Sequence, residues 1–111
     1  MAKDYKVVGQ AAPSADTDTV LYTVPANTSF VASSLVIANR DAGSSAAYRI
    51  AVVPSGESLG LKHYLRYNVL IDARGHADIV IGIALSAGDA VYVHAVGTPH
   101  LSFSLFGVEN S

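Results

Sequence analysis

Alternation of apolar and polar residues is the dominant pattern along this chain, and its period is two. The clearest case lies near the end of the sequence, where Leu101, Phe103 and Leu105 alternate with Ser102 and Ser104. Because successive side chains of a β-strand point to opposite faces, this spacing predicts a strand with one face in the core. No stretch longer than a turn has the spacing of an amphipathic helix. The pattern therefore predicts an all-β protein.

The longest predicted strand runs over 29–39 and follows a shorter one over 20–24. Pro25 separates the two because proline cannot donate to a β-ladder, and Asn27 and Thr28 favour a turn. Turn residues recur at intervals of roughly 8–12 residues. The other strands are expected over 5–10, 46–53, 62–71, 76–83, 90–95 and 100–108. About eight short strands at this spacing are typical of an antiparallel β-sandwich of the jelly-roll kind.

We expect residues 1–19 to form an N-terminal arm and linker, and residues 20–111 to form the sandwich domain. Within the arm, 5–10 has the composition of a short strand, and small and polar residues connect it to the body. Val7 and Val8 are too few to build a core of their own, so this strand needs another surface. Three arrangements remain open: a flexible tail, a strand within its own subunit, or a strand added to a neighbouring subunit or to a larger assembly.

Composition adds that the chain carries little charge. Half of the residues are hydrophobic and 14% are charged, against about a quarter in an average soluble domain. We therefore expect part of the surface to contact a partner, with a homotrimer as the favoured assembly. The net charge of −2 and the scattered Lys and Arg residues argue against a nucleic-acid partner. No apolar run approaches the ~20 residues of a membrane-spanning helix, and the absence of cysteine excludes disulfides.

Residue types that commonly catalyse reactions or bind metals occur here without the usual spacing. The four histidines lack the HxH pair of metal-binding cupins, and the nearest approach is His76 with Asp78. Most of the acidic residues lie in predicted turns or in the linker, where Asp is a routine turn former. The chain has neither a GxSxG elbow nor a glycine-rich phosphate loop. We therefore expect no enzymatic activity, no cofactor and no functional metal.

Tyrosine and arginine at outward positions of the predicted strands are the candidate binding residues. A tyrosine ring beside Arg or His can serve a carbohydrate platform or a protein interface, because it is rigid and amphipathic. Half-buried side chains that cap the core are the equally open alternative. Strict alternation over 62–71 would place Tyr64, Arg66 and Asn68 on one face and His63, Leu65, Tyr67 and Val69 on the other. The candidate interface residues are Tyr5, Val7, Val8, Tyr48, Arg49, Tyr64, Arg66 and Tyr92.

The chain contains several short motifs: YTVPA at Tyr22–Ala26, a serine- and valine-rich strand ending at Asn39, VVP at Val52–Pro54, LSAGD at Leu85–Asp89 and FGVE at Phe106–Glu109. Together they resemble the motifs of a recurrent type of small bacteriophage virion protein. The resemblance spans about residues 20–109, which is most of the chain. One departure is Asn27, because the pattern usually has glycine there. The motifs lie at turns and strand ends, so they are specific for the fold and weak on the role.

The resemblance implies a β-sandwich protein that decorates phage heads or forms knobs on tails and fibres, commonly as a trimer. The leading hypothesis is a non-enzymatic capsid decoration, or cement, protein that is located in the virion and stabilises the head through oligomeric contacts. The alternative is a knob associated with the tail, collar or fibre that binds carbohydrate or a host receptor. In both cases the expected partners are copies of the chain and phage capsid or tail proteins.

Overall fold

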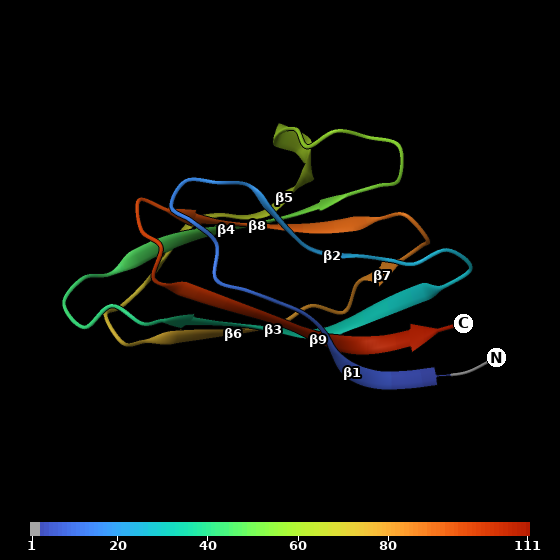
Figure 1. Ribbon diagram of the computed structural model, residues 1–111, viewed down its shortest axis with the longest axis horizontal. Helices are drawn as coiled ribbons and strands as arrows, with labels where there is room; N and C mark the ends of the chain where they lie inside the picture. The colour runs from blue at the N-terminus through green and yellow to red at the C-terminus, as the bar shows by residue number, and fades with distance from the viewer. Residues whose placement is uncertain (1–2) are drawn as a thin grey trace.

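Two antiparallel sheets packed face to face make up the computed structural model, which describes residues 3–111 (Figure 1). Sheet A contains, in spatial order, β1 (Lys3–Ala11), β9 (Leu101–Asn110), β3 (Ser29–Asn39) and β6 (His76–Val80), and the short β7 (Ala84–Leu85) also pairs with β3. Sheet B contains β2 (Thr19–Thr23), β8 (Ala90–Val96), β4 (Ala46–Val53) and β5 (Tyr64–Ile71). A 3₁₀ turn, η1 (Leu61–His63), precedes β5.

The strand pairs are nested, as they would be in one long hairpin of the chain that has been folded over. β1 pairs with β9, β2 with β8, β3 with β6 and β4 with β5, all of them antiparallel. Pairing of β3 with β9 and of β4 with β8 completes the two sheets. This arrangement is a jelly roll. The expected antiparallel sandwich is thus confirmed.

The strand expected over 76–83 ends at Val80 as β6, and β7 follows at Ala84–Leu85, which gives nine strands in place of about eight. The reason lies in β3, whose register with β9 shifts between Ala32 and Ser34. Opposite this bulge the ladder becomes irregular, with the Ile81 amide 3.2 Å from the Ser33 carbonyl oxygen. A bulge of this kind bends its strand and interrupts pairing with the neighbour.

The core lies between the inward faces of the two sheets, where the alternation in the sequence predicted it. Leu101, Phe103 and Leu105 of β9 are buried, as are the predicted inward residues of β8, which are Val91, Val93 and Ala95. β3 contributes Phe30, whose ring lies 4.9 Å from that of Tyr22 across the sandwich. Complete burial of side chains of this size stabilises the fold by about 1.5–3 kcal/mol each.

β1 is the edge strand of sheet A within its own subunit, which is one of the arrangements that the sequence left open. It pairs with β9 from Lys3 opposite Asn110 to Ala11 opposite Phe103. The crossing near β2 requires glycine, because a Cβ on Gly9 would lie 2.2 Å from the Leu21 carbonyl oxygen. The strand of the expected arm therefore belongs to the sandwich, where it covers an edge of β9 that would otherwise be unpaired. Residues 1–2 of the arm lie outside the described part.

A polar cluster joins the two sheets beside β1. The Tyr22 hydroxyl of β2 donates to Glu109 of β9, and the Lys6 ammonium of β1 lies 2.9 Å from the same carboxylate. The hydrogen bonds from Lys6 and Tyr22 lower the pKa of Glu109, and the carboxylate in turn raises the pKa of Lys6. Burial raises the pKa of the Tyr22 hydroxyl. The carboxylate is thus stabilised in its ionised form by folding.

We expect the protein to lose stability in acid. The pKa of Glu109 is lower in the folded state than its unfolded value of 4.5, so its contribution is present above that value and is lost as the pH falls through the folded pKa. The urea midpoint should therefore fall below pH ~4.5, and Glu109→Gln should make this fall shallower. Asp72→Asn is the matched control, and an unchanged pH profile in Glu109→Gln would contradict the assignment.

Candidate functional site

A bulge in β5 creates the most distinctive group of side chains on the outer face of sheet B. Between Arg66 and Val69, three steps along β5 match two steps along β4. The extra residue places both Tyr67 and Asn68 opposite Arg49. Asn68 has a φ of 54°, a left-handed conformation that Asn adopts more readily than most residues. The bulge therefore directs two neighbouring residues of one strand toward a single arginine.

Tyr64 and Tyr67 lie on the same face of the sheet because of a further register shift between them, whereas strict alternation predicted opposite faces. Their rings contact edge to face with centroids 5.0 Å apart. A second register shift, at Leu65, separates Tyr64 from Arg66, and Arg66 pairs directly with the inward-facing Ile50. The prediction that Tyr64 and Arg66 share a face is therefore wrong, because each bulge adds one residue and reverses the alternation.

Arg49 is held in a defined orientation by its two neighbours on β5. Its guanidinium carbon lies 4.3 Å from the centroid of the Tyr67 ring, within the range of a cation–π interaction. Its Nε donates to the Asn68 Oδ1 at 2.7 Å. The terminal nitrogens of Arg49 make no hydrogen bond to any residue in the range 3–111, which leaves their N–H groups available to a ligand.

We call this group, together with Tyr92, the aromatic surface; its members are Arg49, Tyr64, Tyr67, Asn68 and Tyr92. Tyr92 lies on β8 opposite Ala51 of β4, and Ala51 in turn pairs with Tyr64. Tyr67 is half exposed, and Tyr64 and Tyr92 are partly exposed. The predicted interface residues Arg49, Tyr64 and Tyr92 are thus brought together on one face.

Tyr67 and Asn68 were not among the predicted interface residues. The signal that could have indicated them is an Asn, which tolerates the left-handed region, inside a predicted strand that has tyrosines three positions apart.

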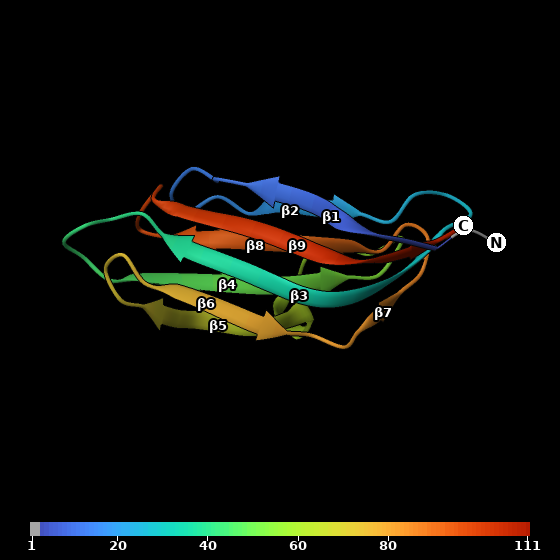
Figure 2. The same cartoon turned by 90° about the horizontal axis from the view of Figure 1, so that it is seen from below.

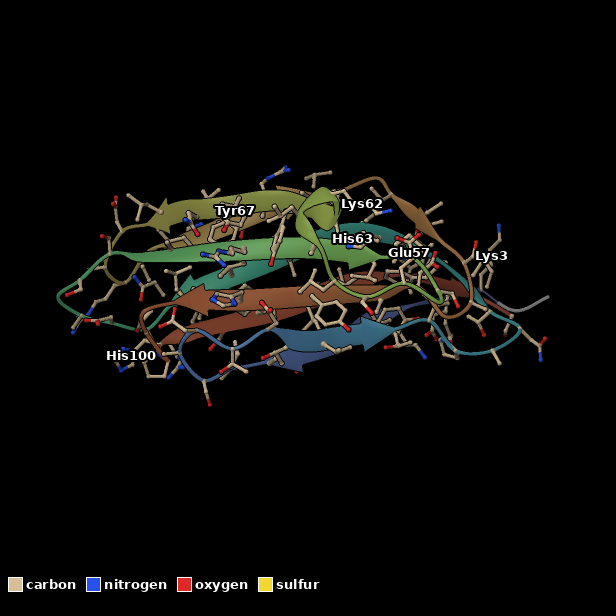
Figure 3. The ribbon with its side chains drawn as sticks, turned by 90° about the horizontal axis from the view of Figure 1, so that it is seen from above. Lys3, Glu57, Lys62, His63, Tyr67 and His100 are labelled. Atoms are coloured by element: carbon tan, nitrogen blue, oxygen red, sulfur yellow. The ribbon has the colours of Figure 1, made fainter. Side chains whose placement is uncertain are left out.

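A loop over residues 54–63 stands above sheet B, and Tyr67 lies on β5 beside it (Figures 1 and 3). His63 Nδ1 accepts the Gly60 amide at 2.8 Å, so its Nε2 carries the proton and donates to Glu57 at 2.9 Å. This hydrogen bond and that from Lys62 lower the pKa of Glu57. The contacts fix the loop over two outward-facing residues of β4, Ala51 and Val53, which are consequently buried.

His94 faces outward as predicted, but the linker before β2 covers its side chain. The linker before β2 crosses this part of β8, and His94 Nδ1 lies 2.7 Å from the Asp18 carboxylate. Its Nε2 lies 3.7 Å from Asp16, whose carboxylate also accepts the Gly97 amide. No group of three or more His, Cys, Asp or Glu residues among 3–111 is arranged to hold a metal ion. His76 and Asp78 remain an exposed pair 3.7 Å apart.

Tyr48 belongs to the core and not to a surface, so its assignment as an interface residue is wrong. It is 3% exposed and pairs with Ala95, on the inward side that it shares with Ile50. Burial raises the pKa of its hydroxyl, and the charge of Arg66 acts in the opposite direction. Alternation over β4 places Tyr48 and Arg49 on opposite faces, so only Arg49 contributes to the aromatic surface.

A second candidate surface, the apolar face, lies on the outer face of sheet A, whose strands are seen from outside in Figure 2. Its members are Tyr5 and Val7 of β1, Phe106 and Val108 of β9, Val31 of β3 and Val80 of β6. The register places Tyr5, Val108 and Val31 in one row across the sheet, and the end of this row borders a shallow hollow.

Exposure is greatest at the two edges of the apolar face. Tyr5 is 83% exposed and Val80 is 86% exposed, while Val7 and Val31 are each 43% exposed. Val8, predicted as an interface residue of the same strand, instead packs partly buried against the core. Val8 follows the outward-facing Val7, so the alternation of the strand already directs it inward.

No family model, curated protein or solved structure matches this chain. Among the described residues there is also no helix with the length and apolar character to cross a membrane. The function must therefore be argued from the two surfaces and from the motifs in the sequence.

Proposed function

We propose that this chain is a non-enzymatic structural protein of a bacteriophage virion, and that it decorates the capsid as a cement protein. The motif resemblance suggests the virion, and the apolar face is the observation that carries a structural role. Contiguous apolar surface of this kind marks contact with another protein. Phage capsid proteins and further copies of the chain are the partners that fit, because the apolar face has few charged side chains.

The sandwich is suited to this role by its construction. Both sheets pack on a continuous core, so the apolar face is presented by four hydrogen-bonded strands and not by a mobile loop. A rigid surface loses little conformational freedom on docking, which favours affinity. Contacts with several shell subunits at once would stabilise the head in the way expected of a cement protein.

The number of copies in purified virions tests the proposal. Quantitative mass spectrometry of particles from the phage that encodes the chain should find copies on the order of hundreds, as expected for a protein that covers a shell by repeated, symmetric contacts. A few copies would favour a tail, collar or fibre knob instead, and absence from the particles would contradict both roles.

The aromatic surface supports the knob as a second candidate function. Exposed tyrosines beside an oriented arginine are the kind of surface that binds carbohydrate or a host receptor. A glycan array tests this candidate, because retention of a sugar is expected of a knob and is not required by the cement role alone.

We expect the purified protein to form a homotrimer in which the apolar face is partly covered. Val80→Asp would place a charge in this contact and should shift the protein to monomers, since burial of an unpaired carboxylate is unfavourable. Leu61→Asp is the matched control, because Leu61 is equally exposed at 86% but lies on the loop above sheet B. Sedimentation velocity at micromolar concentration measures both. A monomeric native protein, or a trimeric Val80→Asp variant, would count against this interface.

A further inference from the structure

We propose that the aromatic surface of sheet B binds an acidic saccharide, with the sugar carboxylate on Arg49 and the pyranose ring against Tyr64 and Tyr67. The inference goes beyond the cement role and specifies the ligand class for the alternative role. It rests on the geometry of one face and is independent of where in a virion the chain is located.

Arg49 is already oriented for a ligand by its neighbours on β5. Stacking on Tyr67 and the bond from Nε to Asn68 fix the plane of the guanidinium before any ligand arrives. The two terminal nitrogens have no partner within residues 3–111. A planar guanidinium with both terminal nitrogens available binds a carboxylate through two parallel hydrogen bonds, which are among the stronger protein–ligand contacts. A group of this geometry indicates a ligand with a carboxylate.

Two tyrosine rings beside this arginine offer a surface for a sugar ring. Tyr64 and Tyr67 meet edge to face, and half of the Tyr67 side chain remains accessible to solvent. Tyrosine rings offer apolar area with little conformational entropy to lose, and their hydroxyls can hydrogen-bond a polar ligand. A pyranose has both an apolar C–H face and a rim of hydroxyls, so it matches this combination. An acidic peptide has the carboxylate but no ring face of this kind.

The local backbone of β5 departs from regular β-structure to build the group. The register shift at Leu65 places Tyr67 on the face of Tyr64, and the bulge at Asn68 adds a second residue opposite Arg49. The left-handed φ of Asn68 is a local cost that regular pairing would avoid. Bulges that redirect a side chain are found beside binding sites. The edge strand β5 thus bears an irregularity whose structural result is the aromatic surface.

The charges around the surface are compatible with an anionic ligand. The acidic side chains on this side of the sandwich include Asp16 and Asp18, which contact His94, and Glu57, which contacts Lys62 and His63. Arg66 of β5 adds a second positive charge on the inward side of the strand. The apolar face lies on the other side of the sandwich (Figure 1), so a bound saccharide would leave it free for a partner.

Titration of the full chain with glucuronate-containing oligosaccharides, followed by calorimetry, tests the proposal. We expect binding that is lowered about tenfold by Arg49→Lys, which keeps the charge but loses the planar fork. Tyr67→Ala should lower it to a similar extent. Asn68→Gly tolerates the left-handed backbone and removes only the anchor of Nε, so it should give a smaller loss. Arg40→Lys is the matched control, because Arg40 is held by Pro99 and Ser102 away from this face.

The neutral glucose oligosaccharide and a polyglutamate peptide are run as competing ligands, and thermal unfolding confirms that each variant is folded. Absence of binding to the glucuronate ligands would overturn the proposal, as would equal binding of the neutral sugar. Equal or tighter binding of polyglutamate would assign the surface to an acidic peptide instead. Unchanged affinity in folded Arg49→Lys would remove Arg49 from the site. None of these outcomes depends on the copy number that tests the virion role.

Discussion

Replacement of Phe103 by alanine is expected to lower the free energy of unfolding by about 3–5 kcal/mol. Phe103 lies at the inward face of β9, between Ala11 of β1 and Ile37 of β3, and is 1% exposed. Truncation removes the whole buried ring, and the two surrounding sheets cannot collapse fully into the space. Because domains of this size are stable by only about 5–15 kcal/mol, the loss is a large fraction of the total.

Urea denaturation followed by circular dichroism measures this loss. Ser104→Ala is the control on the same strand, because Ser104 points outward and its hydroxyl only accepts a hydrogen bond from the exposed Gln10 side chain. The control should change the stability by no more than about 0.5 kcal/mol. A Phe103→Ala variant as stable as the native protein would show that the inward face of β9 is wrongly assigned.

Asn39→Ala is the second substitution for which we expect a large effect, about 2–4 kcal/mol. Asn39 is 3% exposed at the end of β3, and its side chain joins two turns. Its Nδ2 donates to the carbonyl oxygens of Ser44, Ile71 and Asp72 at 3.0–3.2 Å, and its Oδ1 accepts the Asp41 amide at 3.0 Å. Without the amide, several partly buried backbone groups lose their partners, and each unsatisfied group costs about 1–3 kcal/mol.

Chemical denaturation measures this second loss, and amide hydrogen exchange at Asp41 and Ser44 locates it. Asn110→Ala serves as the control, because Asn110 lies at the end of β9 and its side chain makes no hydrogen bond to residues 3–111. A loss in Asn39→Ala no greater than in the control, with unchanged exchange in the turn, would show that the hydrogen bonds of Asn39 do not hold the two turns together.

The sequence predicted the fold well where one face of a strand is buried. The bounds of β3 and β4 coincide with the predicted 29–39 and 46–53, because both are central strands whose alternation the core enforces. The sequence indicated Asn39 only as part of a motif, and its role as a buried link between two turns could be recognised only in the structure. The antiparallel sandwich agrees with the expected class, whereas the order in which its strands pair required the structure.

The aromatic surface could be predicted only in part, because it depends on an edge strand. β5 is exposed on most of its residues, so burial does not constrain its register and one inserted residue reverses the faces. Both Tyr48 and Arg49 were predicted as interface residues, although alternation in the central β4 places them on opposite faces and only Arg49 outward. Tyr67 was placed on the wrong face because a bulge has no signature in a simple hydrophobic pattern. The burial of His94 under the linker could likewise not be predicted from the sequence, since it depends on contacts between distant segments.

The nested pairing also brings the two ends of the described chain together, with Lys3 opposite Asn110 (Figure 1). Adjacent ends of this kind allow circular permutation, in which the original ends are joined and new ones are opened elsewhere. The same geometry makes the protein suitable for the display of foreign peptides. A peptide fused at either end would extend from the same end of the sandwich, and both outer faces would stay accessible.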